Sequence, residues 1–454
     1  MSTGEDKEPP KVKRIDLGSD PIPKVFVSYA LPSVLGLFVM TSATIVDGIF
    51  VGRFVGPHAL ASINLIVPLV LVLSGIAAMI GTGGATVSNI RRGARHLLEA
   101  NRLYTLTLLL LAGFGFGILL VGRADLGTIS DVLGADESVS YLVTDYLGVI
   151  LLFAPFFMLT FAEDLFIRGD GHPVFPAAIL IGGSLTNIVL DYYFIAVLGW
   201  GIKGAAWATG ASQVVPFLLL LAFLVRRSTW CFTWPRVAAS SVVRLMYNGL
   251  SEFVDQASFG VSHYIFNLVL MARIGALGVA AYSIAGYTVQ LVGVLFFGIA
   301  QAIHPAVSFN IGAGNVERVR RFRNVAFGAN AVIGFLGFLF LQLLRGPIAG
   351  FFVTDPGVVA LASEISYYFS FALLAAGLNI AAATYFTALD RPTESALIAL
   401  SRSLIVLLIG LLTLPLLFGL TGIWLSFCLA EFATLVLVAY LVKNKGIRLP
   451  QLAQ

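Results

Sequence analysis

Long apolar runs alternate with short polar segments along almost the whole chain. An α-helix rises about 1.5 Å per residue, so about 20 apolar residues cross the roughly 30 Å hydrocarbon core of a bilayer. Twelve runs reach that length, and the pattern therefore predicts an all-α polytopic membrane protein with twelve transmembrane helices. The predicted helices cover residues 25–54, 59–88, 103–122, 139–163, 173–198, 202–225, 247–272, 279–308, 325–345, 361–388, 393–418 and 421–442.

The composition of the chain agrees with this prediction. Of the 454 residues, 58% are hydrophobic and 11% are charged, whereas a soluble domain needs more charge to cover its surface. The net charge of +4 comes from basic residues in short clusters between apolar runs, so we expect membrane lipids as partners and no nucleic acid. The two cysteines, Cys231 and Cys428, fall in a loop and in a span, and no disulfide framework is expected.

The positions of Lys and Arg predict the orientation of the chain in the membrane. An even number of spans places both termini on one side, and most of the 28 Lys and Arg residues, Arg402 among them, fall on that side. Cytoplasmic loops are rich in Lys and Arg, so both termini are predicted to be cytoplasmic in a multi-pass protein of the cell (plasma or inner) membrane. Residues 1–24 are polar and lack the apolar core of a signal peptide, which indicates a cytosolic tail. The remaining basic residues fall on the opposite side of the membrane: Arg53, Arg123, Lys203, Arg273 and Arg345.

The two halves of the chain resemble each other at a spacing of about 220 residues, as parallel repeats in transporters do. GRFVGPHALAS (52–62) aligns with ARIGALGVAAY (272–282), and Asp170 aligns with Asp390. Six helices repeated on six predict two lobes related by a pseudo-two-fold axis along the membrane normal. The predicted divisions are an N-terminal tail (1–24), an N-lobe with helices 1–6 (25–225), an interlobe loop (226–246), a C-lobe with helices 7–12 (247–443) and a C-terminal tail (444–454).

Several polar side chains interrupt the apolar runs of the first half. Asp47 lies in the stretch TSATIVDGIF (41–50), and a charged Asp at a helix centre costs about 2.5–3.5 kcal/mol on insertion scales. Asn187 and Asp191 are four residues apart and share one face of helix 5, while Thr209 lies in helix 6. Two carboxylates, an amide and a hydroxyl suit a hard cation such as Na⁺. Two neighbouring carboxylates also favour binding of a proton, so both readings stay open.

The second half lacks these carboxylates. Asn267 stands at the position equivalent to Asp47, and the sequence near position 411, which is equivalent to Asp191, reads LLTL. The repeat is therefore symmetric in its scaffold but not in its charge. A purely structural role does not explain that difference, which favours an ion or proton site in the first half.

The stretch VDGIFVGRFVGPHALA (46–61) resembles the multidrug and toxic compound extrusion (MATE) family, and specifically its DinF-like branch. The resemblance covers residues 25–443. It implies two six-helix lobes around a central cleft and export of amphiphilic, often cationic compounds, driven by inward H⁺ or Na⁺ flow. The spacing of Asn187, Asp191 and Thr209 is similar to the cation site of archaeal members of that branch. The same resemblance adds the backbone carbonyl of Ala205 as a ligand.

The resemblance also implies roles for other polar or helix-distorting residues. Pro32 lies on the helix that carries Asp47, and in the family bending of helix 1 is proposed to follow protonation of its Asp; a static kink is the alternative. Another branch uses acidic residues of its second lobe, which points to Glu252 and Asp255 as residues of a substrate cleft; an interfacial or ion-pairing role is the alternative. Asp164 could line the same cleft, although ion pairing is the alternative. Glu431 has no partner that the sequence identifies.

The function expected from the sequence is a secondary active antiporter that works by alternating access as a monomer, with no cofactor and with H⁺ or Na⁺ as the coupling ion. The alternative is a lipid-linked precursor flippase of a related superfamily. The chain has no HExxH helix, and its five histidines show no metal-like spacing, so an enzyme is not expected. The sequence leaves open the substrate and the choice between H⁺ and Na⁺.

Overall fold

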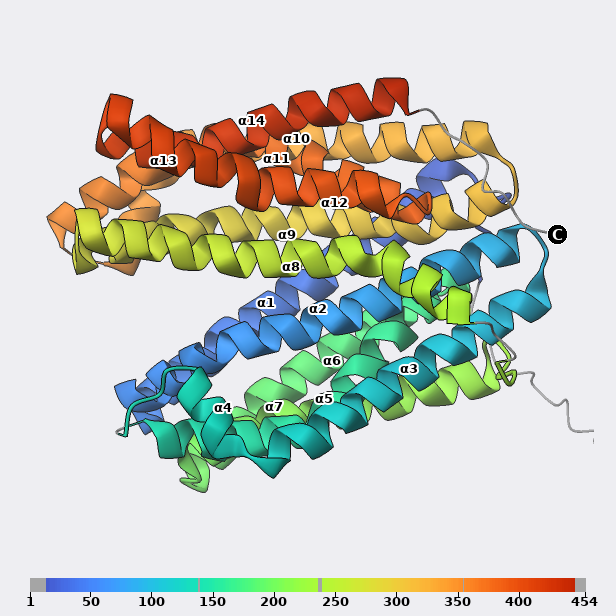
Figure 1. Ribbon diagram of the computed structural model, residues 1–454, viewed down its shortest axis with the longest axis horizontal. Helices are drawn as coiled ribbons and strands as arrows, with labels where there is room; N and C mark the ends of the chain where they lie inside the picture. The colour runs from blue at the N-terminus through green and yellow to red at the C-terminus, as the bar shows by residue number, and fades with distance from the viewer. Residues whose placement is uncertain (1–13, 138, 236–238, 354, 446–454) are drawn as a thin grey trace, which may run out of the picture.

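The computed structural model describes residues 14–137, 139–235, 239–353 and 355–445, and throughout these residues the regular structure is helical. Two helical lobes follow one another along the chain and lie side by side (Figure 1). The first contains α1 (Ile22–Phe50), η1 (Val51–Val55), α2 (Pro57–Gly93), α3 (Leu97–Ala124), α4 (Leu126–Val132), α5 (Ser140–Gly169), α6 (Val174–Asp191), η2 (Tyr192–Val197) and α7 (Gly201–Arg226), where η marks a π-helical turn. The second contains α8 (Ala239–Arg273), α9 (Ala276–Gly312), α10 (Val316–Phe352), α11 (Pro356–Ala388), α12 (Pro392–Leu400), η3 (Ser401–Ile405), α13 (Val406–Phe418) and α14 (Leu420–Asn444).

Most predicted spans correspond to these helices, with differences at their ends. Eleven helical segments of the described residues are long and apolar enough to cross a membrane. The remaining predicted span, 247–272, forms as part of α8. This helix carries polar residues such as Glu252 and Asp255 and is therefore less apolar than most of the others. The helix α8 begins at Ala239, inside the predicted interlobe loop, and α10 begins at Val316, nine residues before the predicted span. The tail residues 1–13 and 446–454 and loop residues 236–238 lie outside the described part of the chain.

The short helix α4 is absent from the sequence prediction. It has 7 residues, fewer than any run that crosses a bilayer, so hydropathy does not detect it. Asp125 caps it, because the Asp125 carboxylate accepts a hydrogen bond of 2.9 Å from the backbone N–H of Thr128. A cap of this kind starts a helix in a polar loop between two spans.

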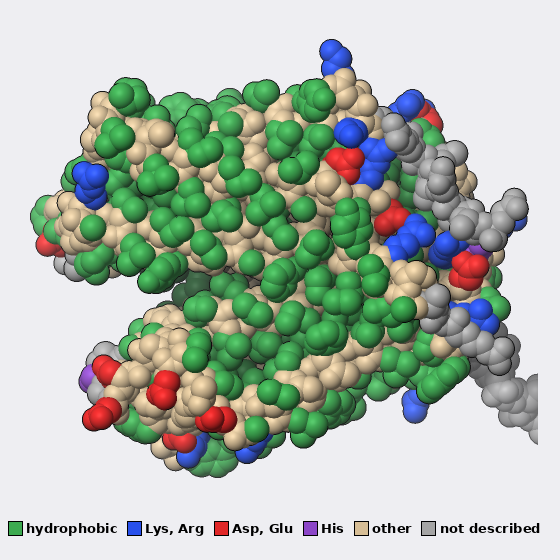
Figure 2. Space-filling view, in the orientation of Figure 1, with side chains coloured by type: hydrophobic (Ala, Val, Ile, Leu, Met, Phe, Trp, Pro, Cys, Tyr) green, Lys and Arg blue, Asp and Glu red, His purple; other side chains and the backbone are tan. Residues whose placement is uncertain are grey.

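The two lobes meet at one end of the molecule and separate at the other (Figure 2). We call the first the closed end and the second the open end. At the contact between lobes, α2 packs on α8 and α9, and α1 packs on α9. The space-filling view shows a hollow between the lobes at the open end, and most of the Lys and Arg side chains visible in it gather at the closed end.

Glycines allow the helices of the two lobes to approach closely. A Cβ atom built on Gly249 of α8 would overlap the carbonyl oxygen of Met79 in α2. A Cβ atom on Gly93 would overlap the carbonyl oxygen of Phe309, and one on Gly312 would overlap that of Ile90. Close approach of backbones at small residues is a common way to join helices in membranes, and here it closes one end of the cleft.

Candidate functional site

The residues of the predicted cation site come from three helices of the first lobe. Asp47 lies in the last turn of α1, and Asp191 is the last residue of α6, one turn after Asn187. Thr209 lies in the first half of α7, one turn after Ala205. The helices α1 and α7 both pack on α6, so segments far apart in the sequence converge here.

The polar atoms of this group are buried and lack protein partners. Asp191 is fully buried, and neither of its carboxylate oxygens accepts a hydrogen bond. The Oδ1 atom of Asp47 and the Oγ1 atom of Thr209 are likewise buried without a hydrogen-bond partner, and the Nδ2 amide of Asn187 donates to none. Buried polar groups are almost always hydrogen-bonded, and an unpartnered carboxylate is costly. These atoms therefore require a partner from outside the protein, for which a proton, a cation or water is suited.

The two carboxylates act on each other and on a tyrosine that sequence reasoning missed. Asp47 and Asp191 are close enough to interact electrostatically, and both interact with the phenol of Tyr146 in α5. Tyr146 is only 6% exposed, and its side chain also approaches Thr209. Nothing in the linear sequence marks Tyr146 among the 14 tyrosines, because only the packing of α5 against α7 brings it to the site.

Both carboxylates lie next to π-helical turns. The turn η1 begins four residues after Asp47, and η2 begins immediately after Asp191. The two turns contact each other, and the Phe50 and Tyr192 rings meet edge to face at 6.3 Å. Single π-helical turns inside α-helices occur frequently at functional sites, and here two of them lie beside the two carboxylates among the predicted cation ligands.

Two other predicted residues of the first lobe have defined surroundings. Pro32 lies inside α1, which remains continuous from Ile22 to Phe50. The next residue, Ser33, accepts a hydrogen bond of 2.6 Å from Arg168 of α5. Arg168 also pairs with Asp164 at 2.6 Å, with both side chains mostly buried. The structure therefore shows the ion pair that is the alternative role for Asp164, whose carboxylate is bound to Arg168.

The second lobe contains a charged group in its interior. Arg402 lies in η3 with its side chain 14% exposed and pairs with Glu431 at 2.8 Å and with Asp255 at 3.9 Å. Glu431 is fully buried and also accepts a hydrogen bond of 2.7 Å from Asn379. The structure thus supplies the partners of Glu431 that the sequence does not identify. The expectation for Arg402 is wrong: it is not a cytoplasmic anchor but an interior residue that neutralises a buried carboxylate.

A small pocket lies beside this group. Glu252, Asp255 and Arg402 line it together with the hydroxyls of Ser251 and Thr384. The predicted cleft residues Glu252 and Asp255 therefore share one pocket, whereas Asp164 lies in the other lobe. Apart from Arg402, the charged side chains of this pocket are acidic, so it suits a cationic group better than an anionic one.

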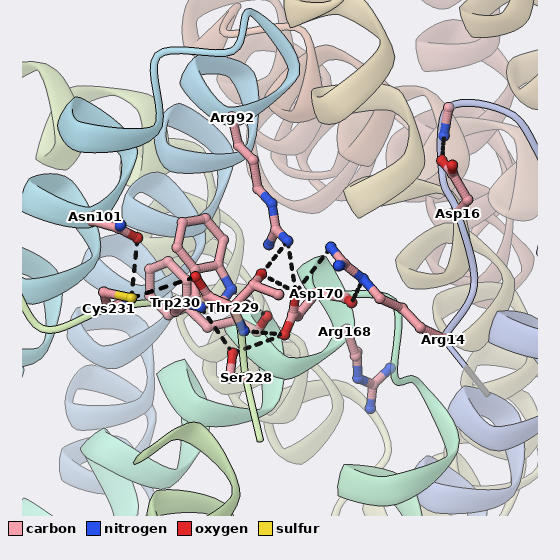
Figure 3. Close-up of polar contacts among 12 residues, drawn as sticks. Arg14, Asp16, Arg92, Asn101, Arg168, Asp170, Ser228, Thr229, Trp230 and Cys231 are labelled. Atoms are coloured by element: carbon pink, nitrogen blue, oxygen red, sulfur yellow. Dashed lines mark hydrogen bonds and ion pairs between the residues drawn. The ribbon is translucent and has the colours of Figure 1, made fainter. Parts of the chain in front are cut away.

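A third polar cluster lies at the closed end and centres on Asp170 (Figure 3). The fully buried Asp170 carboxylate accepts hydrogen bonds from Arg92 at 2.6 Å, from the Ser228 hydroxyl at 2.8 Å and from the backbone N–H of Thr229 at 2.9 Å. Arg92 also lies over the Trp230 ring at 4.7 Å. Burial by itself would raise the pKa of Asp170, but the Arg92 charge and the hydrogen bonds from Thr229 and Arg92 outweigh it and lower that pKa. This cluster ties the segment that follows α7 to the first lobe.

Among the described residues, no group of three or more His, Cys, Asp and Glu side chains is arranged to hold a metal ion. The candidate site instead offers oxygens of two carboxylates, an amide and a hydroxyl. Such a donor set fits a proton or an alkali cation.

Two helical lobes with apolar outer surfaces, a hollow between them and buried carboxylates inside both lobes are the features of a membrane transporter. The sequence model of the MatE family matches residues 32–193 and 254–412. The chain therefore belongs to the MATE family, as the resemblance of its sequence predicts. It is a multi-pass protein of the cell membrane.

Relatives and solved structures of this family match nearly the whole chain. It is 24% identical over 430 residues to the multidrug export protein MepA of Staphylococcus saprophyticus, covering 93% of this chain and 94% of the relative. It is 23% identical over 431 residues to MepA of Staphylococcus aureus strain MRSA252, covering 94% and 95%. A solved structure of a multidrug resistance MATE family transporter of the MOP superfamily in an outward-facing conformation matches with a TM-score of 0.87 and 24% identity, covering 94% of this chain and 98% of that one. A transporter of the same superfamily from Pyrococcus furiosus matches with a TM-score of 0.88 and 24% identity, covering 94% and 96%. These structures show the two-lobe fold.

Proposed function

We propose that the protein is a secondary active antiporter that exports amphiphilic, often cationic compounds in exchange for H⁺ or Na⁺. The observation that carries the proposal is the pair of unpartnered carboxylate oxygens of Asp191, buried beside Asp47 in the first lobe. A membrane protein keeps such a group at a cost, and reversible loading with a cation or proton accounts for it. The relatives named multidrug export proteins support the substrate class.

The proposed orientation follows the basic clusters. Positive residues favour the cytoplasmic side, so the closed end and both chain termini face the cytoplasm and the hollow opens outward. From the outer side, Asp47 and Asp191 load a proton or Na⁺, with Asn187, Thr209 and the Ala205 carbonyl as further ligands. Tyr146 orients the carboxylates from α5.

Loading removes the repulsion between the two carboxylates and changes the packing of α1, α6 and α7. Pro32, which leaves one backbone carbonyl of α1 without its helical donor, permits this helix to bend. The change weakens substrate binding, the lobes rock to face inward, and the cation leaves as a new substrate enters. One elementary charge that moves with the membrane potential supplies roughly 2.3 kcal/mol per 100 mV, which corresponds to about a fifty-fold concentration ratio.

The cationic part of the substrate is proposed to bind at Glu252 and Asp255 in the pocket of the second lobe. Arg402 already neutralises part of the charge of Asp255 and Glu431, whereas no hydrogen bond or ion pair of Glu252 is found among the described residues. Glu252 is therefore the stronger candidate for direct contact with a cation. We place Asp164 only at the lower edge of the cleft, because its carboxylate is already paired with Arg168. The protein is proposed to act as a monomer with the five divisions that its sequence predicts.

Transport in proteoliposomes tests this function. A pH gradient or a Na⁺ gradient is imposed, and uptake of a fluorescent lipophilic cation is followed for the unmodified protein, for Asp191→Asn and for Asp131→Asn. Asp131 is exposed on α4, so its substitution makes the same charge change away from the site. We expect transport to follow one gradient, to be lost in Asp191→Asn and to persist in Asp131→Asn. Coupled transport that survives in Asp191→Asn would contradict the proposal.

A further inference from the structure

The chain segment before α1, residues 14–20, spans both lobes at the closed end. Its first residues bind the first lobe at the turn after α5. Arg14 donates a hydrogen bond of 2.9 Å from Nε to the carbonyl oxygen of Asp170, and its guanidinium lies 3.2 Å from the Asp170 carboxylate. The backbone N–H of Ile15 donates to the carbonyl oxygen of Gly171 at 2.9 Å. Figure 3 shows Arg14 reaching Asp170 from the chain that leads to α1.

The next residues bind the second lobe. The carbonyl oxygen of Leu17 accepts hydrogen bonds of 2.9 Å from the Asn310 side chain in α9 and 3.0 Å from the Arg318 guanidinium in α10. Arg318 also donates to the carbonyl oxygen of Asp20. Gly18 lies so close to Phe309 that an added Cβ atom would be 3.1 Å from the ring.

The side chains of this segment belong to the core as well. Ile15 and Leu17 are 9% and 5% exposed and form part of a hydrophobic cluster with residues of α1, α9, α10, α11 and α14. The segment is therefore built into the contact between lobes and is more than a surface loop lying across it. Most of the other buried residues of this cluster belong to the second lobe, whereas Arg14, which binds the first lobe, is 49% exposed.

The length of chain between the two anchors limits how far the lobes can separate. The anchor to the first lobe ends at Ile15, and the anchor to the second begins at Leu17. An extended chain spans at most about 3.6 Å per residue, so this two-residue step reaches about 7 Å. The turn after α5 and the α9–α10 connection cannot move farther apart than this allows while both anchors hold.

We propose that residues 14–20 form a strap that locks the closed end, and that the strap must leave the first lobe before the cleft can open at that end. The Arg14 anchor releases first, because it is half exposed while the Leu17 anchor is buried. The strap thereby favours molecules that are shut at the closed end over molecules that are open there, and it slows transport. This inference rests on the alternating access of the proposed function, but not on the identity of the coupling ion or the substrate.

Distances between spin labels test the strap without requiring transport. In protein with Cys231 and Cys428 replaced by Ser, one label pair at His96 and Glu317 reports on the closed end, and one at Val132 and Phe351 reports on the open end. A deletion of residues 2–20 removes the strap. A deletion of residues 2–13 keeps it and is the matched control.

We expect the 2–20 deletion to raise the ratio of molecules open at the closed end to those open at the other end by at least about tenfold. That is the effect of losing a single hydrogen bond to a charged group. The label pair at the open end should shorten in the same molecules. The 2–13 deletion should match the full chain.

A double substitution keeps the test decisive if the longer deletion does not fold. Arg14→Ala combined with Arg318→Ala weakens both anchors by removing their charged hydrogen-bond donors, and Arg320→Ala combined with Arg321→Ala makes the same charge change at exposed positions of α10. A shift in the first pair and not in the second supports the strap. Unchanged distances in the anchor variants would overturn it, even where their thermal stability falls. Such a result would leave the proposed antiport intact, and loss of coupling in Asp191→Asn has no bearing on these distances.

Discussion

Replacement of Asp170 by Asn is expected to destabilise the closed end strongly. The carboxylate is fully buried and receives hydrogen bonds from Arg92, Ser228 and Thr229, while the Arg92 side chain is itself only 9% exposed. Removing one partner of a buried ion pair costs about 3–5 kcal/mol, because the other charge remains buried and uncompensated. We expect a loss of that size in the free energy of unfolding, measured by chemical denaturation in mixed micelles.

The repeat of the chain supplies a graded control. Asp390 occupies the equivalent position in the second lobe, where it pairs with Arg244 and accepts a hydrogen bond of 2.8 Å from Asn248. The Asp390 and Arg244 side chains are 15% and 37% exposed, so water screens this pair and Asp390→Asn should cost about 1–2 kcal/mol. Asp131→Asn, at an exposed position, should change stability by no more than about 0.5 kcal/mol.

The dependence on pH provides a second check. The pKa of Asp170 is lower in the folded protein than in the unfolded chain, so the carboxylate stabilises the fold at pH values above its unfolded pKa, about 3.9. This contribution is lost as the pH falls through the folded-state pKa. The deficit of Asp170→Asn should therefore be constant between about pH 5 and pH 8 and shrink in stronger acid. If Asp170→Asn loses no more stability than Asp131→Asn at neutral pH, the reasoning from buried charge is refuted.

Three further predictions concern other parts of the molecule. Gly249→Ala should push α8 away from α2 and lower both stability and transport, whereas Gly113→Ala, at a position with open space around it, should leave both unchanged; thermal unfolding and uptake assays compare them. Tyr146→Phe should keep the fold but weaken cation-driven transport about tenfold, because one hydroxyl beside both carboxylates is lost; equal activity at all cation concentrations would contradict this. Arg402→Met should cost about 3–5 kcal/mol in stability by leaving Glu431 buried without its cation, and partial recovery in the double variant with Glu431→Gln would identify the pair as the cause.

Much of the architecture could be predicted from the sequence because the bilayer makes simple demands on it. Each span needs a long apolar run, so the run 25–54 anticipates α1 with η1, and 202–225 anticipates α7 within a few residues. The predicted span for α8 begins too late, because Ser240, Ser241 and Arg244 interrupt the apolar pattern of its first turns. Hydropathy does not predict α4, because seven residues with an Asp cap are too few for an apolar run of membrane-spanning length.

The candidate site was predictable in part. Asp47, Asn187, Asp191 and Thr209 could be selected because an ionisable or amide side chain in an apolar run is unusual enough to stand out. Tyr146 could not, since a tyrosine is ordinary in a membrane helix and becomes part of the site only through the packing of α5.

The sequence by itself determined the class of the protein, its helical spans, its internal repeat and the asymmetry of charge between the halves. These features depend on local composition and on spacing along the chain, which the cost of polar groups in lipid controls directly. The tertiary structure alone decided which buried charges have partners. In the folded protein Asp191 has no hydrogen-bond partner, Glu431 forms an ion pair with Arg402, and Asp170 binds side chains or backbone of three separate segments. Pairing of this kind depends on contacts between residues far apart in the chain. A local sequence pattern does not reveal such contacts. Whether a carboxylate in an apolar run has a hydrogen-bond or ion-pair partner depends on which side chain of a distant helix packs against it.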